Sequence, residues 1–349
     1  MPHGGKERSD FMESVVYASL GKKSRSVVVG PGRGLDNAVV SVGGGRVVVV
    51  TVDPVSAIPA FGMRLSAWMS VHLIASDITS SGVDPQFATF AYNFPPSMTR
   101  AQREEYVRAV GAECARLGVA IAAGHTGSYP GGGFTVIGSG VMFGAAAEGG
   151  YVTPAMARDG DAIVMTKHAG IEAAATLAIA FPGFLAKRVG ERTVRRAGAM
   201  ARLCSTVEEA RAARGAGLGV GGVSSMHDAT EGGVLGALEE MAQASGKAFV
   251  VDAEEIPVSE EARAVCGAFG IDPLNTMGEG ALLITCARER VRELERRLAS
   301  AGAHAAEVGR VERGTGLWLG KGKRPRRASL PGRDRFWAAY DRGLRLGYR

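Results

Sequence analysis

Residues 224–246 read SSMHDATEGGVLGALEEMAQASG, and the second half of this stretch has the apolar spacing of an amphipathic helix. The stretch ends in a glycine, where a C-terminal cap belongs. Its first helical turn contains Gly232 and Gly233, each of which costs about 1 kcal/mol relative to alanine. Asp228 stands just before them. The pattern predicts a helix over 233–245 whose glycine-rich start needs a separate explanation.

The chain has 349 residues, which is too long for one comfortable core and fits two domains. Hydrophobic residues make up 46% and charged residues 22%, an ordinary globular composition. No apolar run is long enough to predict a transmembrane helix. The first residues lack the basic-then-apolar pattern of a signal peptide, so we expect a cytoplasmic protein.

The cysteines are far apart and form no C-x-x-C pair. Each lies in an apolar context. Buried free thiols are therefore favoured over disulfides or metal ligands. The four positions are Cys114, Cys204, Cys266 and Cys286.

The net charge of +6 belongs to the last residues and not to the body of the chain. Residues 321–349 carry ten Lys or Arg and two Asp or Glu, which leaves the remainder slightly acidic. Such a tail can contact nucleic acid. We favour a solvated, partly helical extension that docks through Phe336, Trp337 and Tyr340. Nucleic acid is therefore an unexpected partner, and the tail should be dispensable for ligand binding.

The first half of the chain predicts a hairpin, two helices and two further strands. Three glycines join the hairpin strands. The predicted elements are strands at 38–42, 46–52, 120–125 and 134–144 and helices at 64–81 and 99–117. A turn-rich stretch then leads into a new strand, which places the domain limits at 1–155 and 156–320, followed by the tail 321–349.

The second half alternates strands and helices, as a mixed α+β domain does. The predicted strands are 162–166, 248–251, 281–286 and 305–311. The predicted helices are 170–180, 190–215, 233–245, 259–269 and 288–301.

Three aspartates lie at positions that suggest a specific role for their carboxylates. Asp36 precedes the hairpin and Asp53 follows it, so antiparallel pairing places both at its open end, with opposed Cβ atoms about 5 Å apart. Asp77 ends an apolar helical ridge beside serine and threonine residues. Like charges this close are unfavourable without a cation, and a hard cation such as Mg²⁺ takes oxygen ligands. For any one of them alone, a turn or cap role is an equal alternative.

The common nucleotide and hydrolase signatures are missing. The sequence contains no P-loop, no G-x-G-x-x-G after a strand, no kinase H-R-D or D-F-G, and no H-E-x-x-H. Any nucleotide would be bound by a less common route.

Six segments in a fixed order resemble the superfamily of AIR synthase, selenophosphate synthetase, thiamine-monophosphate kinase and the hydrogenase maturation protein HypE. The likeness covers most of residues 20–312, and the nearest branch resembles archaeal HypE-related proteins. Each segment is weak alone, and the ordered set is specific. The segments are GPGRGLDNAVV, VTVDPV, ASDITSSGVDP, AAGHT, MHDATEGGVLGAL and GIDPLNTMGEGALLI.

The resemblance implies an α+β, two-domain AIR-synthase-like fold. Its N-terminal domain would form a β-barrel with its copy in a homodimer, and its C-terminal domain would be an α/β sandwich. ATP and Mg²⁺ would lie in the cleft between the domains. The implied function is ATP- and Mg-dependent phosphoryl transfer that activates an amide or carbonyl oxygen of a small substrate. A non-catalytic ATP-binding scaffold, or a partner of another maturation protein, is the alternative.

The resemblance also assigns residues to the site. The implied Mg²⁺ ligands are Asp36, Asp53, Asp77 and Asp228. The implied catalytic residues are Asp228, His125 and Lys6. The implied nucleotide-binding residues are Gly34, Asn37, Asp77, Gly124, Gly170, Glu172, Gly232 and Gly233. On this interpretation the paired glycines admit a phosphate to the helix N-terminus.

Plainer roles remain open for three of these residues: Asp228 as a cap, Glu172 as a favourable first-turn acid, and Lys6 as part of a frayed terminus.

Two departures from the family pattern bear on function. Leu35 stands where the family has an acidic residue, and Asn37 where it has an alanine, so one carboxylate of the metal cluster is missing. HypE ends in a cysteine, whereas this sequence has no cysteine after Cys286. The first departure somewhat favours the scaffold alternative.

Overall fold

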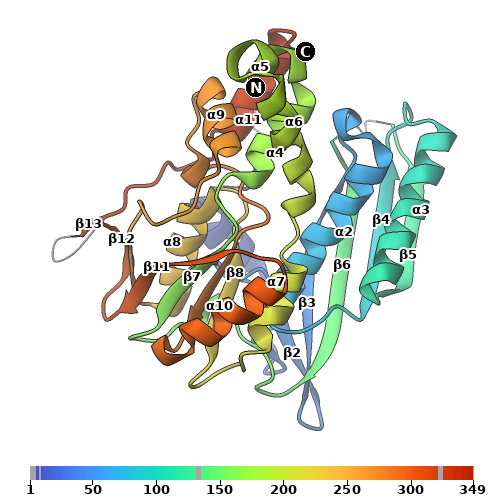
Figure 1. Ribbon diagram of the computed structural model, residues 1–349. Coiled ribbons are helices and arrows are strands. Elements are labelled where there is room, and N and C mark those ends of the chain that lie inside the picture. The colour runs from blue at the N-terminus through green and yellow to red at the C-terminus, as the bar shows by residue number, and fades with distance from the viewer. Residues whose placement is uncertain (1–4, 8, 131–134, 321–324, 349) are drawn as a thin grey trace.

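The computed structural model describes residues 5–7, 9–130, 135–320 and 325–348. The chain forms two mixed α+β halves, each built on its own sheet (Figure 1). The beginning of the glycine-rich N-terminal segment, residues 1–4, lies outside the described part.

The N-terminal half has a sheet with strand order β1-β2-β3-β6-β4-β5. The predicted hairpin is confirmed, with Ala38 opposite Val50. Its second strand continues to Ser56, so Asp53 lies within β3 opposite Gly140 of β6 and not after the strand as predicted. Strand β4 was not predicted from the sequence, and it lies between β6 and β5. The strands are β1 Val27–Val29, β2 Ala38–Gly43, β3 Arg46–Ser56, β4 Phe87–Phe94, β5 Ala120–Ser128 and β6 Val136–Ala147.

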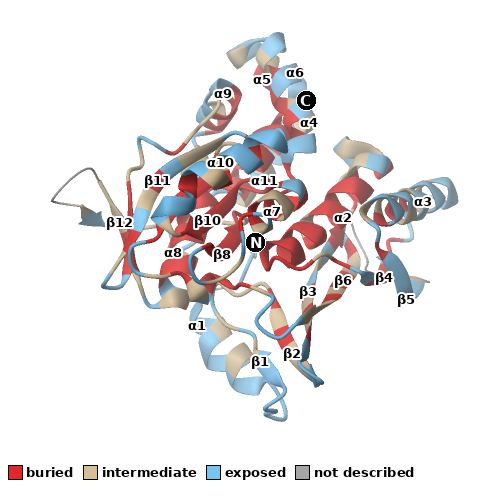
Figure 2. Cartoon of the chain, turned by 60° about the horizontal axis from the view of Figure 1, so that its bottom comes forward, coloured by how far each residue is buried: buried red, intermediate tan, exposed pale blue. Residues whose placement is uncertain are grey.

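Helices α2 (Gly62–Ser80) and α3 (Arg100–Leu117) confirm both helices predicted in this half. Thr99 and Gln102 form a capping box that starts α3. Helix α2 is buried over most of its length, because one side packs on the N-terminal sheet and the other on the C-terminal half (Figure 2). This helix therefore brings Asp77 to the boundary between the two halves.

The other face of the N-terminal sheet is uncovered in the single chain. Strand β5 is exposed along almost its whole length (Figure 2). Val52 is 63% and Val136 57% exposed. The sheet is open and does not close into a barrel within one chain. Closure with a second copy stays a prediction, and these exposed apolar side chains are what it would cover.

The C-terminal half has a sheet with strand order β13-β12-β9-β11-β7-β10-β8 and helices on both faces. Alternate residues of β7 serve the two sides: Ile163 packs with α8, and Val164 packs with α7 and α10. The strands are β7 Ala162–Thr166, β8 Val223–Asp228, β9 Ala248–Val251, β10 Leu282–Cys286, β11 Ala305–Glu312, β12 Gly316–Leu319 and β13 Arg326–Arg327. The helices are α4 Ile171–Ala180, α5 Pro182–Val189, α6 Glu191–Ala199, α7 Val207–Arg214, α8 Gly233–Ser245, α9 Glu260–Phe269 and α10 Val291–Ser300.

Two predictions in this half need correction. The helical region 190–215 is not continuous, since α6 is followed by a 3₁₀ turn at Met200–Leu203 before α7 begins. Strand β8 was not predicted, because its polar sequence resembles a loop although all six of its residues are buried. Its polar side chains are buried because they face the boundary between the halves and the neighbouring strands.

The basic tail docks as the aromatic pattern predicted. Helix α11 (Phe336–Arg345) buries Phe336, which is 1% exposed. The Tyr348 ring stacks on Phe184 at 3.7 Å between centroids. The four cysteines are free and buried, as expected. In the described part of the chain, no helix is both long and apolar enough to cross a membrane.

Replacing Phe336 by alanine should release α11 from the body of the protein, because that ring supplies the fully buried contact of the helix. Amide hydrogen exchange across 336–345 should accelerate at least tenfold. The matched control is Leu344→Ala, at a residue of the same helix that is 57% exposed. Unchanged exchange in Phe336→Ala would show that the tail is held elsewhere.

Candidate functional site

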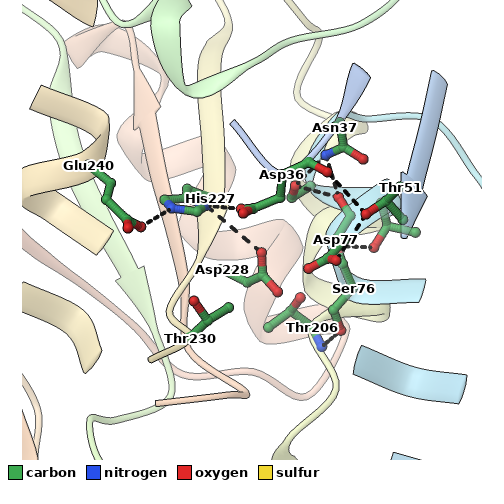
Figure 3. Close-up of polar contacts among 12 residues, drawn as sticks. Asp36, Asn37, Thr51, Ser76, Asp77, Thr206, His227, Asp228, Thr230 and Glu240 are labelled. Carbon is green, nitrogen blue, oxygen red and sulfur yellow. Dashed lines mark hydrogen bonds and ion pairs between the residues drawn. The ribbon is translucent and has the colours of Figure 1, made fainter. Parts of the chain in front are cut away.

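Carboxylates from both halves meet at their boundary (Figure 3). Asp36 precedes β2, Asp77 lies on α2, and Asp228 ends β8. Asp36 Oδ2 lies 2.9 Å from His227 Nδ1, and Asp228 Oδ1 lies 4.0 Å from the same nitrogen. The Asp36 contact is an ion pair without the alignment of a full hydrogen bond. Residues far apart in the sequence thus form one cluster.

His227 is the cationic centre of this cluster. Its side chain is fully buried, and its Nε2 lies 3.1 Å from Glu240 Oε2 on α8. Burial alone would lower its pKa, but the carboxylates of Asp36 and Glu240 raise it to about 10. His227 is therefore charged at neutral pH and holds the N-terminal half to α8 through two acidic partners.

Asp77 has few compensating groups. Thr51 Oγ1 lies 3.0 Å from Asp77 Oδ2 and 3.0 Å from the Asp36 carbonyl oxygen, and its single proton serves one of them at a time. Burial, followed by the carboxylates of Asp228, Asp53 and Asp36, raises the pKa of Asp77 well above its usual range. The unpaired ionised form of this buried side chain is therefore unfavourable.

Asp53 and Asp228 share this behaviour. Burial and the neighbouring carboxylates raise the pKa of Asp53 to about 7, although Lys6 opposes the shift. Burial and Asp36 raise the pKa of Asp228 to about 6. Both carboxylate oxygens of Asp228 are buried without a hydrogen-bond partner among the described residues.

This donor set fits a divalent cation. Ligand atoms of Asp36, His227 and Asp228 lie within 4.8 Å of one another. His227 already has two acidic partners, so the carboxylates are the natural ligands of a hard ion. The unpartnered oxygens of Asp228 are the observation that carries the fit, since buried polar atoms are normally paired.

The N-terminal segment reaches the same cluster. Lys6 Nζ lies 3.0 Å from Thr230 Oγ1, and its backbone N–H donates to Glu231. Desolvation by the surrounding groups would lower the pKa of Lys6, although the residue is exposed at the surface of the chain, but Glu240 and three aspartates of the cluster raise it above its usual value. Lys6 is thus a cation beside the carboxylates, where its ammonium group could contact a phosphate.

The glycines that begin α8 have a local explanation. Both adopt the left-handed backbone, with φ of +88° at Gly232 and +66° at Gly233. A Cβ on Gly233 would lie 2.6 Å from the Thr276 carbonyl oxygen, so the protein's own loop makes the close approach. The Gly232 N–H donates to Asp334 Oδ2 of the tail at 2.9 Å. A phosphate at this N–H would have to displace Asp334. The tail therefore contacts the site, although the sequence had predicted that it is dispensable for ligand binding.

Gly34 and Asn37 lie at the boundary in supporting positions, and Gly170 lies at the start of α4. Gly34 has φ +70°, and a Cβ there would lie 2.8 Å from the Glu240 carbonyl oxygen. Asn37 Nδ2 donates to the Asp77 carbonyl oxygen at 2.8 Å. Gly170, with φ +72°, is the N-cap of α4.

His125 and Gly124 do not join the cluster in the single chain. Both lie on the edge strand β5, which is separated from β2 by the three strands β3, β6 and β4. His125 is exposed, and its Nε2 lies 2.7 Å from the Tyr129 hydroxyl. A contribution of His125 to the same site requires a second copy of the chain.

Two family models match consecutive parts of the sequence. The AIR synthase related protein N-terminal domain matches residues 34–146, and the corresponding C-terminal domain matches residues 158–319. The chain belongs to the AIR synthase-related family. Its two halves therefore have the two-domain fold that the sequence motifs implied.

Curated relatives of this AIR synthase-related chain include hydrogenase formation proteins. Carbamoyl dehydratase HypE of Rhizobium leguminosarum bv. viciae is 29% identical over 80% of this chain and 77% of its own. A putative hydrogenase expression/formation protein, MJ0676 of Methanocaldococcus jannaschii, is 25% identical over 82% of this chain and 81% of its own.

Solved structures share the fold. AaThiL complexed with AMPPCP and TMP has a TM-score of 0.69 at 18% identity, with 92% of this chain and 96% of that chain covered. The HypE–HypF complex gives a TM-score of 0.67 at 19% identity, covering 92% and 99%. HypE in complex with ATP gives 0.62 at 19% identity, covering 94% and 97%.

Several polar residues of the site were not predicted. Thr51, His227, Glu240 and Asp334 carry no role in the sequence interpretation. His227 had the best available signal, because it directly precedes Asp228. Asp334 had no sequence signal, because it belongs to a basic tail whose position is decided by packing alone.

Proposed function

We propose that this AIR synthase-related protein binds Mg-ATP at the carboxylate cluster and transfers the γ-phosphoryl group to an amide or carbonyl oxygen of a small substrate. The observation that carries the proposal is the buried carboxylate of Asp228, which has no hydrogen-bond partner among the described residues and lies beside Asp53 and Asp77. Such a cluster is unfavourable by itself and becomes favourable when a divalent cation neutralises it. The nucleotide complexes of AaThiL and HypE support ATP as the ligand that accompanies the ion.

The chain's own residues have distinct roles in this proposal. Asp36, Asp53, Asp77 and Asp228 hold Mg²⁺, which neutralises charge on the phosphates. Lys6 contacts a phosphate oxygen, and His227 keeps Asp36 ionised and in place. Catalysis of this kind depends mainly on positioning and charge neutralisation.

A release assay tests the activity directly. The protein with Mg-ATP should release inorganic phosphate slowly alone. Release should be faster when a fraction of small metabolites supplies the acceptor, because transfer leaves ADP and the phosphorylated oxygen then departs from the acceptor as phosphate. A screen of metabolites for thermal stabilisation with Mg-ATP then identifies the substrate class. Binding of Mg-ATP without any acceptor-dependent release would instead favour the scaffold alternative, to which Leu35 points. A maturation partner, as in the HypE–HypF complex, would then be sought.

We also propose a homodimer formed through the N-terminal sheet. Light scattering at micromolar concentration should give twice the mass of the 349-residue chain. Val52→Lys, at a side chain that is 63% exposed, should weaken the dimer because it puts a charge into the covered face. Val220→Lys, at a loop residue that is 89% exposed, is the control. A monomeric wild-type protein would contradict the proposal and leave His125 outside the site.

A further inference from the structure

Segments near both ends of the sequence meet at the turn that begins α8. From one side, the Lys6 backbone N–H donates to Glu231 Oε2 at 2.8 Å, and Lys6 Nζ lies 3.0 Å from Thr230 Oγ1. From the other side, Asp334 of the tail accepts the Gly232 N–H. The turn 230–232 therefore lies between the tail and residues 5–7, which we call the N-terminal strap.

The tail is fixed at this place by contacts of its own. Asp334 Oδ1 accepts hydrogen bonds from the Thr276 hydroxyl at 3.0 Å and from the Phe336 N–H at 2.8 Å. Phe336 is buried in the C-terminal half, and its ring meets the Trp337 ring edge-on at 5.3 Å between centroids. Because these contacts do not involve the strap, the tail presents the indole of Trp337 to it as a preformed surface.

The strap passes between this indole and the turn that begins α8. Gly5 has φ +118°, a backbone conformation that residues with a side chain rarely adopt. A Cβ at this position would meet the Glu231 carboxylate and lie 3.1 Å from Trp337 Cδ1. Only glycine allows so close an approach, and the approach fixes the position of the next residue, Lys6.

The position of Lys6 matters because this side of the site is acidic. Although desolvation opposes the shift, Glu240 and three aspartates of the cluster raise the pKa of Lys6 above its usual value. Asp334 adds a further negative charge: burial, and then Asp334, raise the pKa of Glu172 in the first turn of α4 to about 8. Lys6 therefore supplies positive charge to a phosphate in surroundings that are otherwise rich in carboxylates.

We propose that the docked tail is a positioning element of the phosphate site. Trp337 is the positioning residue: its indole holds Gly5 against Glu231, and the strap then keeps the Lys6 ammonium group beside the carboxylates. Asp334 anchors the tail in the place that this requires. The inference rests on the proposed function, because that function gives Lys6 a phosphate to contact.

The inference also locates the phosphate. Because Asp334 accepts the Gly232 N–H, this donor at the start of α8 is occupied while the tail is docked. The phosphate is then contacted by Lys6 and the cation, and the tail is needed for full Mg-ATP affinity.

Acetylation of Lys6 tests the positioning without any nucleotide. Only the unprotonated amine reacts, so a lysine whose pKa is raised is acetylated slowly. Trp337→Ala and Gly5→Ala should each free the strap, return the pKa of Lys6 toward its ordinary value, and accelerate acetylation of Lys6 at least tenfold at pH 8. Peptide mass spectrometry measures the rate, with the exposed Lys22 of the same chain as the internal reference.

Two matched controls make the result specific. Gly21→Ala changes a glycine with φ +69° at which an added Cβ meets open space. Leu344→Ala changes a side chain of α11 that is 57% exposed. Neither control should change the Lys6 rate. Unchanged acetylation of Lys6 in both Trp337→Ala and Gly5→Ala would overturn the inference.

Nucleotide binding separates a positioning role from a general structural one. Trp337→Ala should weaken Mg-AMPPCP binding at least fivefold in the otherwise unchanged chain, but less than twofold in a chain that already carries Lys6→Met. Equal weakening in both backgrounds would show that the tail acts without Lys6 and would contradict the inference. A wild-type chain that binds no Mg-AMPPCP, while the Lys6 rate still rises in both test variants, would count against the proposed function alone.

Discussion

Mg-ATP binding should weaken at least tenfold, about 1.4 kcal/mol, when Asp53 or Asp77 is replaced by asparagine. Asparagine keeps the size of the side chain and removes the charge that the cation needs. The apo variants should stay folded and melt at or above the wild-type temperature at pH 8, because a carboxylate that repels its neighbours is gone. Calorimetric titration of Mg-ATP and thermal melts of the apo proteins measure both effects.

The pH dependence of the apo protein follows from the same cluster. The folded-state pKa of Asp53, about 7, lies above its unfolded value near 3.9, so the folded state binds more protons between these values. The free energy of unfolding contributed by this group therefore falls as pH rises from about 4 to 7. Mg²⁺ should reverse the loss in the wild type and have less effect in Asp53→Asn.

Asp84→Asn is the matched control for these variants. Asp84 lies in the same half of the chain and is paired with Arg211 and Arg214, each at 2.7 Å. Its pKa lies below the usual value, since the hydrogen bonds from both arginines outweigh the effect of burial. Asp84→Asn should lower apo stability and spare Mg-ATP binding. If Asp53→Asn and Asp77→Asn behave like it, their role is structural and the metal site is wrong.

The largest loss of stability is expected from His227→Gln, about 3 kcal/mol, because it leaves Asp36 and Glu240 without the cation between them. Urea unfolding of the apo protein measures this loss. His304→Gln, at an exposed histidine, is the control and should change stability by less than about 0.5 kcal/mol.

The pH profile separates a charged His227 from a neutral one. Its folded-state pKa of about 10 exceeds the unfolded value near 6.5. The stability it contributes is therefore complete below about pH 6.5 and is lost as pH rises toward 10. The difference between wild type and His227→Gln should shrink over that range. A difference that is constant from pH 6 to 10 would show that His227 is buried in its neutral form.

Local sequence alone determined much of this protein. Periodic apolar spacing placed α2, α3, α8 and both hairpin strands, because each buries one regular face or stripe against a core. The turn glycines and the positions of Asp36 and Asp53 around the hairpin predicted that carboxylates would gather at one end. The family motifs added the two-domain fold, which residues 34–146 and 158–319 confirm.

Only the tertiary structure decided what completes the site. Strand β8 is polar yet fully buried, since His227 and Asp228 find their neighbours on other elements. Glycine is required at position 233 because a Cβ there would clash with carbonyl oxygens of a loop 41–43 residues further along the chain. No local sequence pattern reveals this contact. Asp334 reaches α8 because aromatic packing of α11 brings the tail back over the C-terminal half. Contacts of this kind depend on long-range burial, and burial is a property of the packed chain.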